Sequence, residues 1–315
     1  MTSAAPAQLD TGWPPPPFLA PVPAMTGTDG VRRFHGLSYA TSPGYRPRLL
    51  DVHVPPGQEP VPAVVWIHGG GWLEGDRRYP PPTVPVELLH GAVLGAGLAL
   101  VGIDYRHSLE APFPAQLHDV KAAVRYVRRH ADVLGIDGER IGAWGESAGG
   151  HLAALAGLVR ADAHGARLEG REGVPDGDSA VRAVVDWYGV SDIEPLLGQT
   201  MPALPAPPGA PPYPHPFEAL LGGGPVAEQA ERARVASPVT YAGGTTAPPF
   251  LLVHGREDRV VPYSQSEALA RALTSAGGDV TLRPVDGADH IFLGSPEVPA
   301  IVAESVDFLR RHLTA

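Results

Sequence analysis

The chain has 315 residues, 43% of them hydrophobic, and its 34 acidic and 24 basic side chains give a formal net charge of -10 at pH 7. This length and composition suffice for one large globular domain or two small ones. The acidic balance disfavours a nucleic-acid-binding protein, which would carry clustered basic residues. Because the chain contains no cysteine, disulfides, thiolate metal sites and cysteine nucleophiles are excluded. The longest apolar run, 93–103, is interrupted by glycines and falls short of the ~18 residues of a membrane-spanning helix, so we expect no membrane span.

The first 30 residues are rich in Pro, Ala and Thr and contain the run WPPPPF at 13–18. We expect an extended arm over 1–30, either disordered or packed near the mouth of the site through Trp13 and Phe18. The start of the chain lacks the basic segment and apolar core of a secretory signal, so we expect a cytoplasmic protein. Residues 31–315 are expected to form one domain.

The segments 31–40 and 48–54 read as two strands around a turn, and in the second strand apolar and polar residues alternate. We expect a hairpin with one wet face, on which His53 is a solvated strand residue. The next strand, 62–67, is apolar throughout, as in strands that are buried on both faces of a parallel sheet.

From this strand on, strands and helices alternate, and this pattern predicts an α/β fold with a mostly parallel sheet covered by helices on both faces. Ligands in such folds bind beyond the carboxyl ends of the strands. The segment 191–241 breaks the alternation with a Pro-rich run at 201–212, and we interpret it as a lid or a surface insertion, with 217–236 more helical. The expected strands are 98–104, 141–144, 181–188, 250–253 and 280–284, and the expected helices are 88–97, 114–130, 150–159, 264–276 and 297–312.

The stretch Gly145-Glu146-Ser147-Ala148-Gly149 lies where a short strand is expected to turn into a helix. This is the G-x-S-x-G pattern of a nucleophile elbow, in which the glycines permit a tight turn and the serine hydroxyl is exposed above the sheet. The Ala148 amide would lie at a helix N-terminus, where unpaired N–H groups favour negative charge.

A serine becomes nucleophilic when a histidine takes its proton and an acid orients that histidine. In this fold the chain order is serine, acid, histidine. The base is expected at His290, in the loop after the last strand. Four side chains compete for the acid, and their spacing after His-Gly and before Val-Val-Pro favours Asp258 over Glu257, Asp286 and Asp289.

The glycines at 69–71 directly follow the buried strand 62–67. Only residues without side chains let the backbone approach a reacting carbonyl so closely, and this predicts amides that hold an oxyanion.

Taken together, these motifs make the chain resemble an α/β-hydrolase of the hormone-sensitive-lipase-like group, close to its feruloyl and acetylxylan esterase-like branch. The resemblance implies Ser147 as nucleophile, Asp258 as acid and His290 as base. It implies an oxyanion hole formed by the amides of Gly70, Gly71 and Ala148, and neither a cofactor nor a metal. The matching motifs are HGGGW at 68–72, DYR at 104–106, PFPA at 112–115, GESAGGH at 145–151, HG at 254–255 with Asp258, and GADH at 287–290.

Three further residues, Trp72, Glu146 and His151, are candidates for substrate binding. Trp72 could instead pack under the insertion, Glu146 could belong to a hydrogen-bond network behind the serine, and His151 could be structural.

The function that follows is hydrolysis of short-chain acyl or small aromatic esters through an acyl-enzyme. We expect a small ester as the binding partner and no nucleic acid, and the sequence is compatible with a homodimer. Amide or formamide hydrolysis, or acyl transfer or cyclisation, would use the same residues. A non-catalytic receptor on this fold would typically have lost the serine or the histidine.

Overall fold

The computed structural model describes residues 16–57, 60–160, 166–197, 214–224, 229–243 and 247–314. Trp13 and the Pro-rich run at 201–212 therefore lie outside the described residues. The lid expected over 191–241 stays a prediction. So does the division into an arm and one domain.

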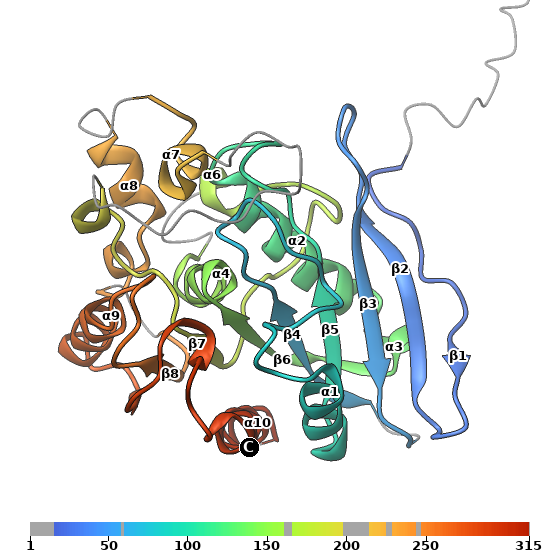
Figure 1. Cartoon of the computed structure of the whole chain (residues 1–315). Helices are drawn as coiled ribbons and strands as arrows, with labels where there is room; N and C mark the ends of the chain where they lie inside the picture. The colour runs from blue at the N-terminus through green and yellow to red at the C-terminus, as the bar shows by residue number, and fades with distance from the viewer. Residues whose placement is uncertain are drawn as a thin grey trace, which may run out of the picture.

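A single mixed sheet forms the centre of the described part of the chain (Figure 1). Its strands follow the order β1-β2-β3-β5-β4-β6-β7-β8-β9, antiparallel from β1 to β5 and parallel from β5 to β9. The expectation of a mostly parallel sheet is confirmed. The strands are β1 Met25–Thr26, β2 Arg32–Ala40, β3 Arg48–Val54, β4 Val61–Ile67, β5 Ala99–Ile103, β6 Ile136–Glu146, β7 Val184–Trp187, β8 Phe250–Gly255 and β9 Val280–Val285.

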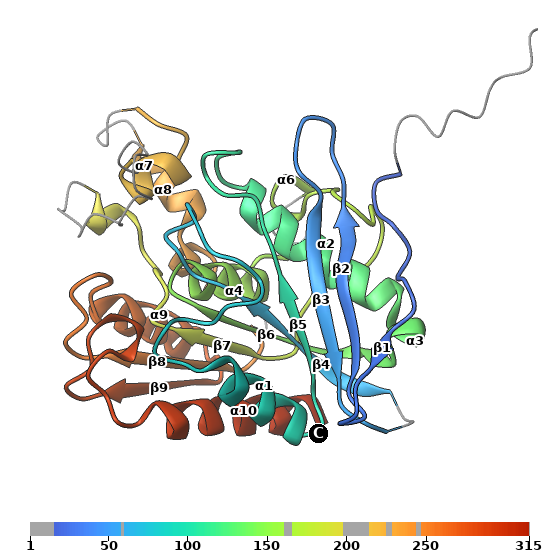
Figure 2. The same ribbon diagram turned by 45° about the vertical axis from the view of Figure 1, so that its right-hand side comes forward.

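Helices cover both faces of the sheet, as the strand–helix alternation predicts (Figure 2). Two separate hydrophobic clusters result, one under α2, α4 and α9 and the other under α1 and α10. The longer helices are α1 Val86–Gly95, α2 Ala115–Arg129, α4 Ala148–Leu158, α9 Ser264–Ser275 and α10 Val298–Thr314. Shorter ones are α3 Ala131–Leu134, α6 Ala166–Glu169, α7 Pro216–Leu220, α8 Ala230–Ala236, η1 Glu194–Leu196, η3 Pro238–Thr240 and η4 His290–Phe292.

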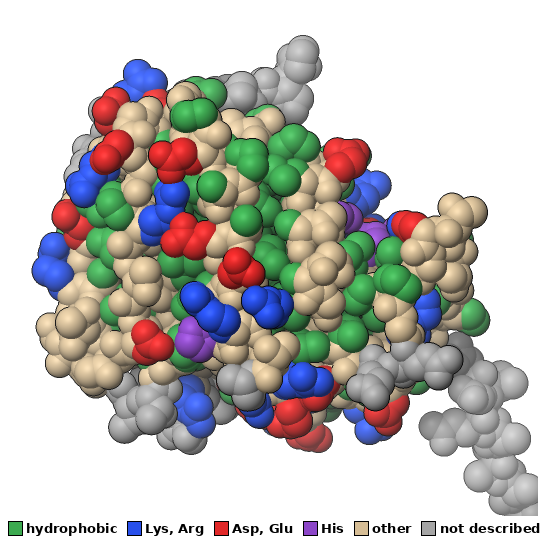
Figure 3. Space-filling model, turned by 90° about the horizontal axis from the view of Figure 1, so that it is seen from below, with side chains coloured by type: hydrophobic (Ala, Val, Ile, Leu, Met, Phe, Trp, Pro, Cys, Tyr) green, Lys and Arg blue, Asp and Glu red, His purple; other side chains and the backbone are tan. Residues whose placement is uncertain are grey.

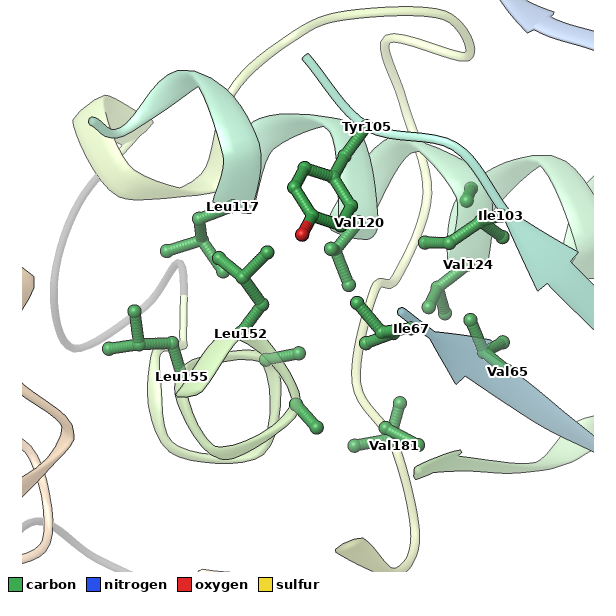
Figure 4. Packing of buried hydrophobic residues seen from close by; sticks show 14 of the residues in the cluster. Val65, Ile67, Ile103, Tyr105, Leu117, Val120, Val124, Leu152, Leu155 and Val181 are labelled. Atoms are coloured by element: carbon green, nitrogen blue, oxygen red, sulfur yellow. The ribbon is translucent and has the colours of Figure 1, made fainter. Parts of the chain in front are cut away.

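The packing of α2 and α4 onto β4 fixes the part of the sheet that carries the elbow (Figure 4). Leu117, Val120 and Val124 recur at helical spacing on α2 and are fully buried. Leu152 of α4 and Ile67 of β4 belong to the same cluster. Each such side chain contributes about 1.5–3 kcal/mol when it is removed from water, so the start of α4 is held firmly over the end of β4.

The polar face of β3 is covered, contrary to the expectation of a wet face. Asp51 is only 4% exposed, because Arg77 Nε lies 3.0 Å from its Oδ1. The His53 ring lies between those of His35 and His90, at centroid distances of 5.5 and 4.8 Å. Burial, followed by the charges of His90 and His35, lowers the pKa of His53 to about 4. His53 is therefore not a solvated strand residue.

The described residues of the segment expected to form an arm lie along α2 and the edge of the sheet. The Phe18 ring lies 6.2 Å from that of Tyr126 and 5.8 Å from that of His130. These residues are at the C-terminal end of α2, roughly 20 Å from its start at the rise of 1.5 Å per residue. Phe113, just before α2, packs against His151 near the elbow. Phe18 therefore lies at the opposite end of α2 from the elbow, and the expectation that it packs near the mouth of the site is wrong.

The face seen from below in Figure 3 shows acidic and basic side chains interspersed among hydrophobic ones. Over the described residues visible in this view, no single sign of charge dominates. This face therefore offers no extended basic patch of the kind that nucleic-acid phosphates require.

Candidate active site

Ser147 occupies the junction of β6 and α4, and its backbone has φ 53 and ψ -118. A positive φ is uncommon for a residue with a side chain and persists only where the surroundings enforce it. Here the Ser147 amide donates to the Trp187 carbonyl at 2.9 Å, and the Ser147 carbonyl accepts from the His151 amide at 3.0 Å. The neighbouring strand β7 and the first turn of α4 thus hold the serine in its strained conformation.

The two glycines of the elbow are required by close backbone approaches. A Cβ on Gly145 would collide with the Gly149 carbonyl, and a Cβ on Gly149 would collide with the carbonyl oxygens of Ile67 and His68. The elbow therefore packs directly against the end of β4, where the glycine-rich loop begins.

Ser147, His290 and Asp258 form one hydrogen-bonded line. The Ser147 hydroxyl lies 3.1 Å from His290 Nε2, and His290 Nδ1 lies 2.8 Å from Asp258 Oδ2. The other carboxylate oxygen of Asp258 accepts from the amides of Val260 and Val261 at 2.9 and 2.8 Å. Each member follows the carboxyl end of a different parallel strand, β6, β9 and β8 respectively, so the sheet brings together residues that are far apart in the chain.

The three competing acids lie elsewhere. Glu257 is exposed, and Asp286 is exposed and pairs with Arg256 at 2.8 Å. Asp289 pairs with Arg259 and also accepts from the His290 amide at 2.7 Å. Of the four candidates, Asp258 is the one that meets the imidazole of His290.

The glycine loop after β4 lies beside the elbow. Gly70 and Gly71 have φ of 101° and 60°, which glycine adopts at no steric cost. The amides of Gly70, Gly71 and Ala148 donate to no other described residue. They can therefore donate to an acceptor atom of a bound molecule. The first glycine is different, because the Gly69 amide donates to Glu146 Oε1 at 2.6 Å.

Glu146, next to the serine, is a buried carboxyl that faces this loop. Burial raises its pKa, while the nearby His290 and the Gly69 amide act in the opposite direction. Its observed partner is thus the glycine loop after β4. The assignment of Glu146 to substrate binding stays a prediction.

Trp72 and His151 are also buried, at 2% and 0% exposure. The Trp72 indole N–H donates to His151 Nδ1 at 3.2 Å, and His151 Nε2 lies 2.7 Å from the Ala236 carbonyl. Direct contact of either residue with substrate remains a prediction.

The sequence argument misses Tyr188, and it includes His254 in a motif without the contact that this histidine makes with Asp258. His254, at the end of β8, places Nε2 3.2 Å from Asp258 Oδ2, and the Tyr188 ring lies 5.0 Å from that of His290. Burial, then the charges of Glu146 and Asp258, raises the pKa of the Tyr188 phenol. Both residues lie at the carboxyl end of a parallel strand, as Ser147, Asp258 and His290 do, and this position is the signal that could have found them.

The described residues contain neither a helix that could span a membrane nor a cluster that could hold a metal ion. None of their helices combines the length and apolar character needed to cross a bilayer. No group of three or more His, Asp or Glu side chains among them is arranged to hold a metal ion.

The parallel sheet, the elbow after β6 and the functional loops gathered at the carboxyl ends of the strands define an α/β-hydrolase. The family model described as BD-FAE matches residues 50–273 of the chain. The chain therefore belongs to the BD-FAE family, and the resemblance inferred from the motifs is confirmed.

Known relatives agree with this assignment. Esterase LipQ of Mycobacterium tuberculosis is 33% identical over 279 residues, which cover 85% of this chain and 60% of LipQ. The chain thus spans about 60% of the length of that relative. A truncated carbohydrate esterase from gut microbiota superposes with a TM-score of 0.75 at 29% identity, over 90% of this chain and 96% of that one. Thermogutta terrifontis esterase 2 phosphoramylated by tabun gives a TM-score of 0.64 at 25% identity, over 86% and 91% of the two chains.

Proposed function

We propose that this protein is a serine carboxylesterase that hydrolyses short-chain acyl or small aromatic esters through an acyl-enzyme. The observation that carries the proposal is the hydrogen-bonded line from Ser147 through His290 to Asp258. The esterase names of LipQ and of the two superposed proteins support the same reaction class.

In the first half of the reaction, Ser147 Oγ forms a bond to the ester carbonyl carbon while its proton passes to His290 Nε2. Asp258 accepts a hydrogen bond from the Nδ1–H of His290, which leaves Nε2 unprotonated to act as the base and stabilises the imidazolium that forms. His290 then gives the proton to the departing alkoxide, and the C–O bond to the alcohol breaks.

In the second half, water attacks the acyl-enzyme, His290 takes a proton from it, and Ser147 leaves with that proton as the acid is released. In both halves the negative charge on the former carbonyl oxygen faces the amides of Gly70, Gly71 and Ala148. Each such donor is worth roughly 10²–10³ in rate.

The preference for small acyl groups is supported by the aromatic side chains around the site. Trp72 directly follows the oxyanion glycines, Phe217 of α7 packs 5.7 Å from it, and Tyr188 packs on His290. We include in the proposal that the segment 191–241, which carries Phe217, acts as the lid.

Hydrolysis of p-nitrophenyl esters of rising acyl length by the wild type and by Ser147→Ala tests the proposal. Rates should be highest for short acyl chains, and the variant should retain no more than about 10⁻³ of wild-type kcat/KM. Equal rates for the two proteins would refute it.

The acyl-enzyme has its own test. A fluorophosphonate should label the wild type at Ser147, as read by peptide mass spectrometry, and should leave Ser147→Ala unlabelled. Product analysis with competing alcohols and amines separates hydrolysis from acyl transfer, because a transferase would yield new esters or amides in place of the free acid.

A further inference from the structure

The imidazole of His151 bridges two parts of the chain that meet beside the candidate active site. Its Nδ1 lies 3.2 Å from the Trp72 indole nitrogen and its Nε2 lies 2.7 Å from the Ala236 carbonyl oxygen. The sequence separations are 79 and 85 residues, so the bridge exists only in the folded chain. We call the set Trp72, His151 and Ala236 the imidazole bridge.

The chemistry of the two partners determines the tautomer of His151. An indole nitrogen can only donate and a carbonyl can only accept, so Nδ1 is the acceptor and Nε2 carries the proton. Burial, opposed by the hydrogen bond to Ala236, lowers the pKa of His151 to about 4. The ring is therefore neutral near pH 7, and both of its nitrogens are satisfied.

The three residues of the imidazole bridge lie in three different elements of the fold. Trp72 follows the oxyanion glycines, has φ 58, and accepts from the Ser108 amide at 2.7 Å. His151 lies in the first turn of α4 and donates its amide to the carbonyl of Ser147. Ala236 ends α8, and its carbonyl is among those that a helix terminus leaves without an intrahelical partner.

Aromatic packing surrounds the bridge. The rings of Trp72 and His151 meet edge to face with centroids 5.1 Å apart, and Phe113 lies 6.4 Å from His151. Phe217 of α7 packs against Trp72, so α7 and α8, which lie side by side in Figures 1 and 2, both reach the bridge. The contacts of Trp72 thus depend on how these two helices are docked.

We propose that His151 is a positioning residue that ties the oxyanion loop to helix α8, so that docking of α7 and α8 sets the position of the Gly70 and Gly71 amides. This inference rests on the proposed esterase function, since it assigns a rate effect to the same loop. Loss of the bridge leaves Ser147, His290 and Asp258 in place but lets the oxyanion donors move.

The first test compares His151→Ala with His151→Gln. The Gln amide has an acceptor oxygen and a donor NH2 group and can reproduce both hydrogen bonds, whereas Ala reproduces neither. His151→Ala should lower kcat by about 10- to 100-fold, part of the value of the oxyanion donors, with KM within about threefold, and His151→Gln should recover most of the loss. His312→Ala on α10 is the matched control and should keep wild-type kinetics.

A double-mutant cycle shows whether Trp72 acts through His151. Trp72→Phe removes the indole N–H and keeps a ring, and it should lower kcat less than His151→Ala does. Combining the two should cost no more than His151→Ala alone, because residues of one network are not additive. Additive losses, or a change confined to KM as expected for a substrate contact, would overturn the proposal. If His151→Ala fails to fold, an unchanged kcat in Trp72→Phe overturns it equally.

A readout that does not depend on activity is exchange of the Trp72 indole proton, followed by nitrogen-15 NMR and assigned from the signal missing in Trp72→Phe. The proton should exchange slowly in the wild type and at least about tenfold faster in His151→Ala. Equal exchange rates would contradict the bridge. A wild type without esterase activity would refute the proposed function, while the exchange measurement would still decide whether the bridge forms.

Discussion

His254 and His290 contact the same oxygen of Asp258. His290 Nδ1 lies 2.8 Å and His254 Nε2 lies 3.2 Å from Oδ2, and His254 also contacts the Ser266 hydroxyl and the Val261 carbonyl. Burial alone would raise the pKa of the Asp258 carboxyl, but hydrogen bonds from His254 and His290 outweigh it and hold the pKa well below its usual range. His254 thus helps to keep the acid ionised and oriented.

Replacing His254 by Phe should therefore weaken catalysis without abolishing it. The ring volume is kept, but Asp258 loses one partner, so we expect kcat to fall by about tenfold with little change in KM. Asp258→Asn should cost far more, about 10³–10⁴ in kcat, because the tautomer of His290 is no longer enforced. Steady-state kinetics on a short-chain ester check both values, and a larger loss in His254→Phe than in Asp258→Asn would contradict this order.

Glu146 offers a matched pair of variants. In Glu146→Gln the amide oxygen can still accept from the Gly69 N–H, whereas Glu146→Ala leaves that buried donor unpaired, at a cost of about 1–3 kcal/mol. We expect Glu146→Ala to lower both kcat and stability and Glu146→Gln to stay within about threefold of wild-type kcat. Kinetics together with urea unfolding would show this. Equal effects of the two variants would mean that the hydrogen bond to Gly69 does not hold the loop.

Substitution of glycine by alanine should change the stability of the fold in opposite directions at Gly149 and at Gly91. Gly149→Ala forces a methyl group against the carbonyls of Ile67 and His68 and should destabilise the fold by about 1–3 kcal/mol while reducing activity. Gly91 is exposed on α1 with open space around it, so Gly91→Ala should stabilise by about 0.5–1 kcal/mol. Urea unfolding of both variants checks the signs, and a neutral Gly149→Ala would show that the elbow is not tightly packed.

Asp186 should make stability depend on pH. It lies on β7 beside Gly145, its Oδ1 accepts from the Gly189 amide at 2.8 Å, and its Oδ2 has no partner among the described residues. Burial, opposed by that hydrogen bond, raises the pKa of Asp186 from 3.8 to about 7. The unfolded chain therefore loses this proton at lower pH than the folded chain does, so the favourable contribution present below about pH 4 is lost as pH rises to about 7.

Asp186→Asn removes this titration. Relative to the wild type, the variant should gain unfolding free energy between about pH 4 and 7, on the order of 4 kcal/mol in total. Urea unfolding at a series of pH values measures the difference. Parallel pH profiles for the two proteins would contradict the raised pKa.

Much of the fold and most of the candidate site follow from local sequence. The alternation of apolar strands and helices predicts the parallel sheet, and the elbow glycines predict where the serine lies, because both reflect backbone geometry within a few residues. The carboxyl-end rule then places Asp258 and His290 on the correct edge. The sequence did not predict that the polar face of β3 is covered. This face is covered because Arg77, from a loop distant in the sequence, pairs with Asp51.

What the sequence by itself determined is the class of fold, the order of serine, acid and histidine, and the position of each after a strand. Only the tertiary structure decided that His254 shares an oxygen of Asp258 with His290, that Glu146 holds the Gly69 amide, and that His151 joins Trp72 to α8. The physical reason is that these contacts are hydrogen bonds between side chains or loops far apart in the chain, and their directions are fixed only when the packed sheet and helices bring both partners within about 3 Å.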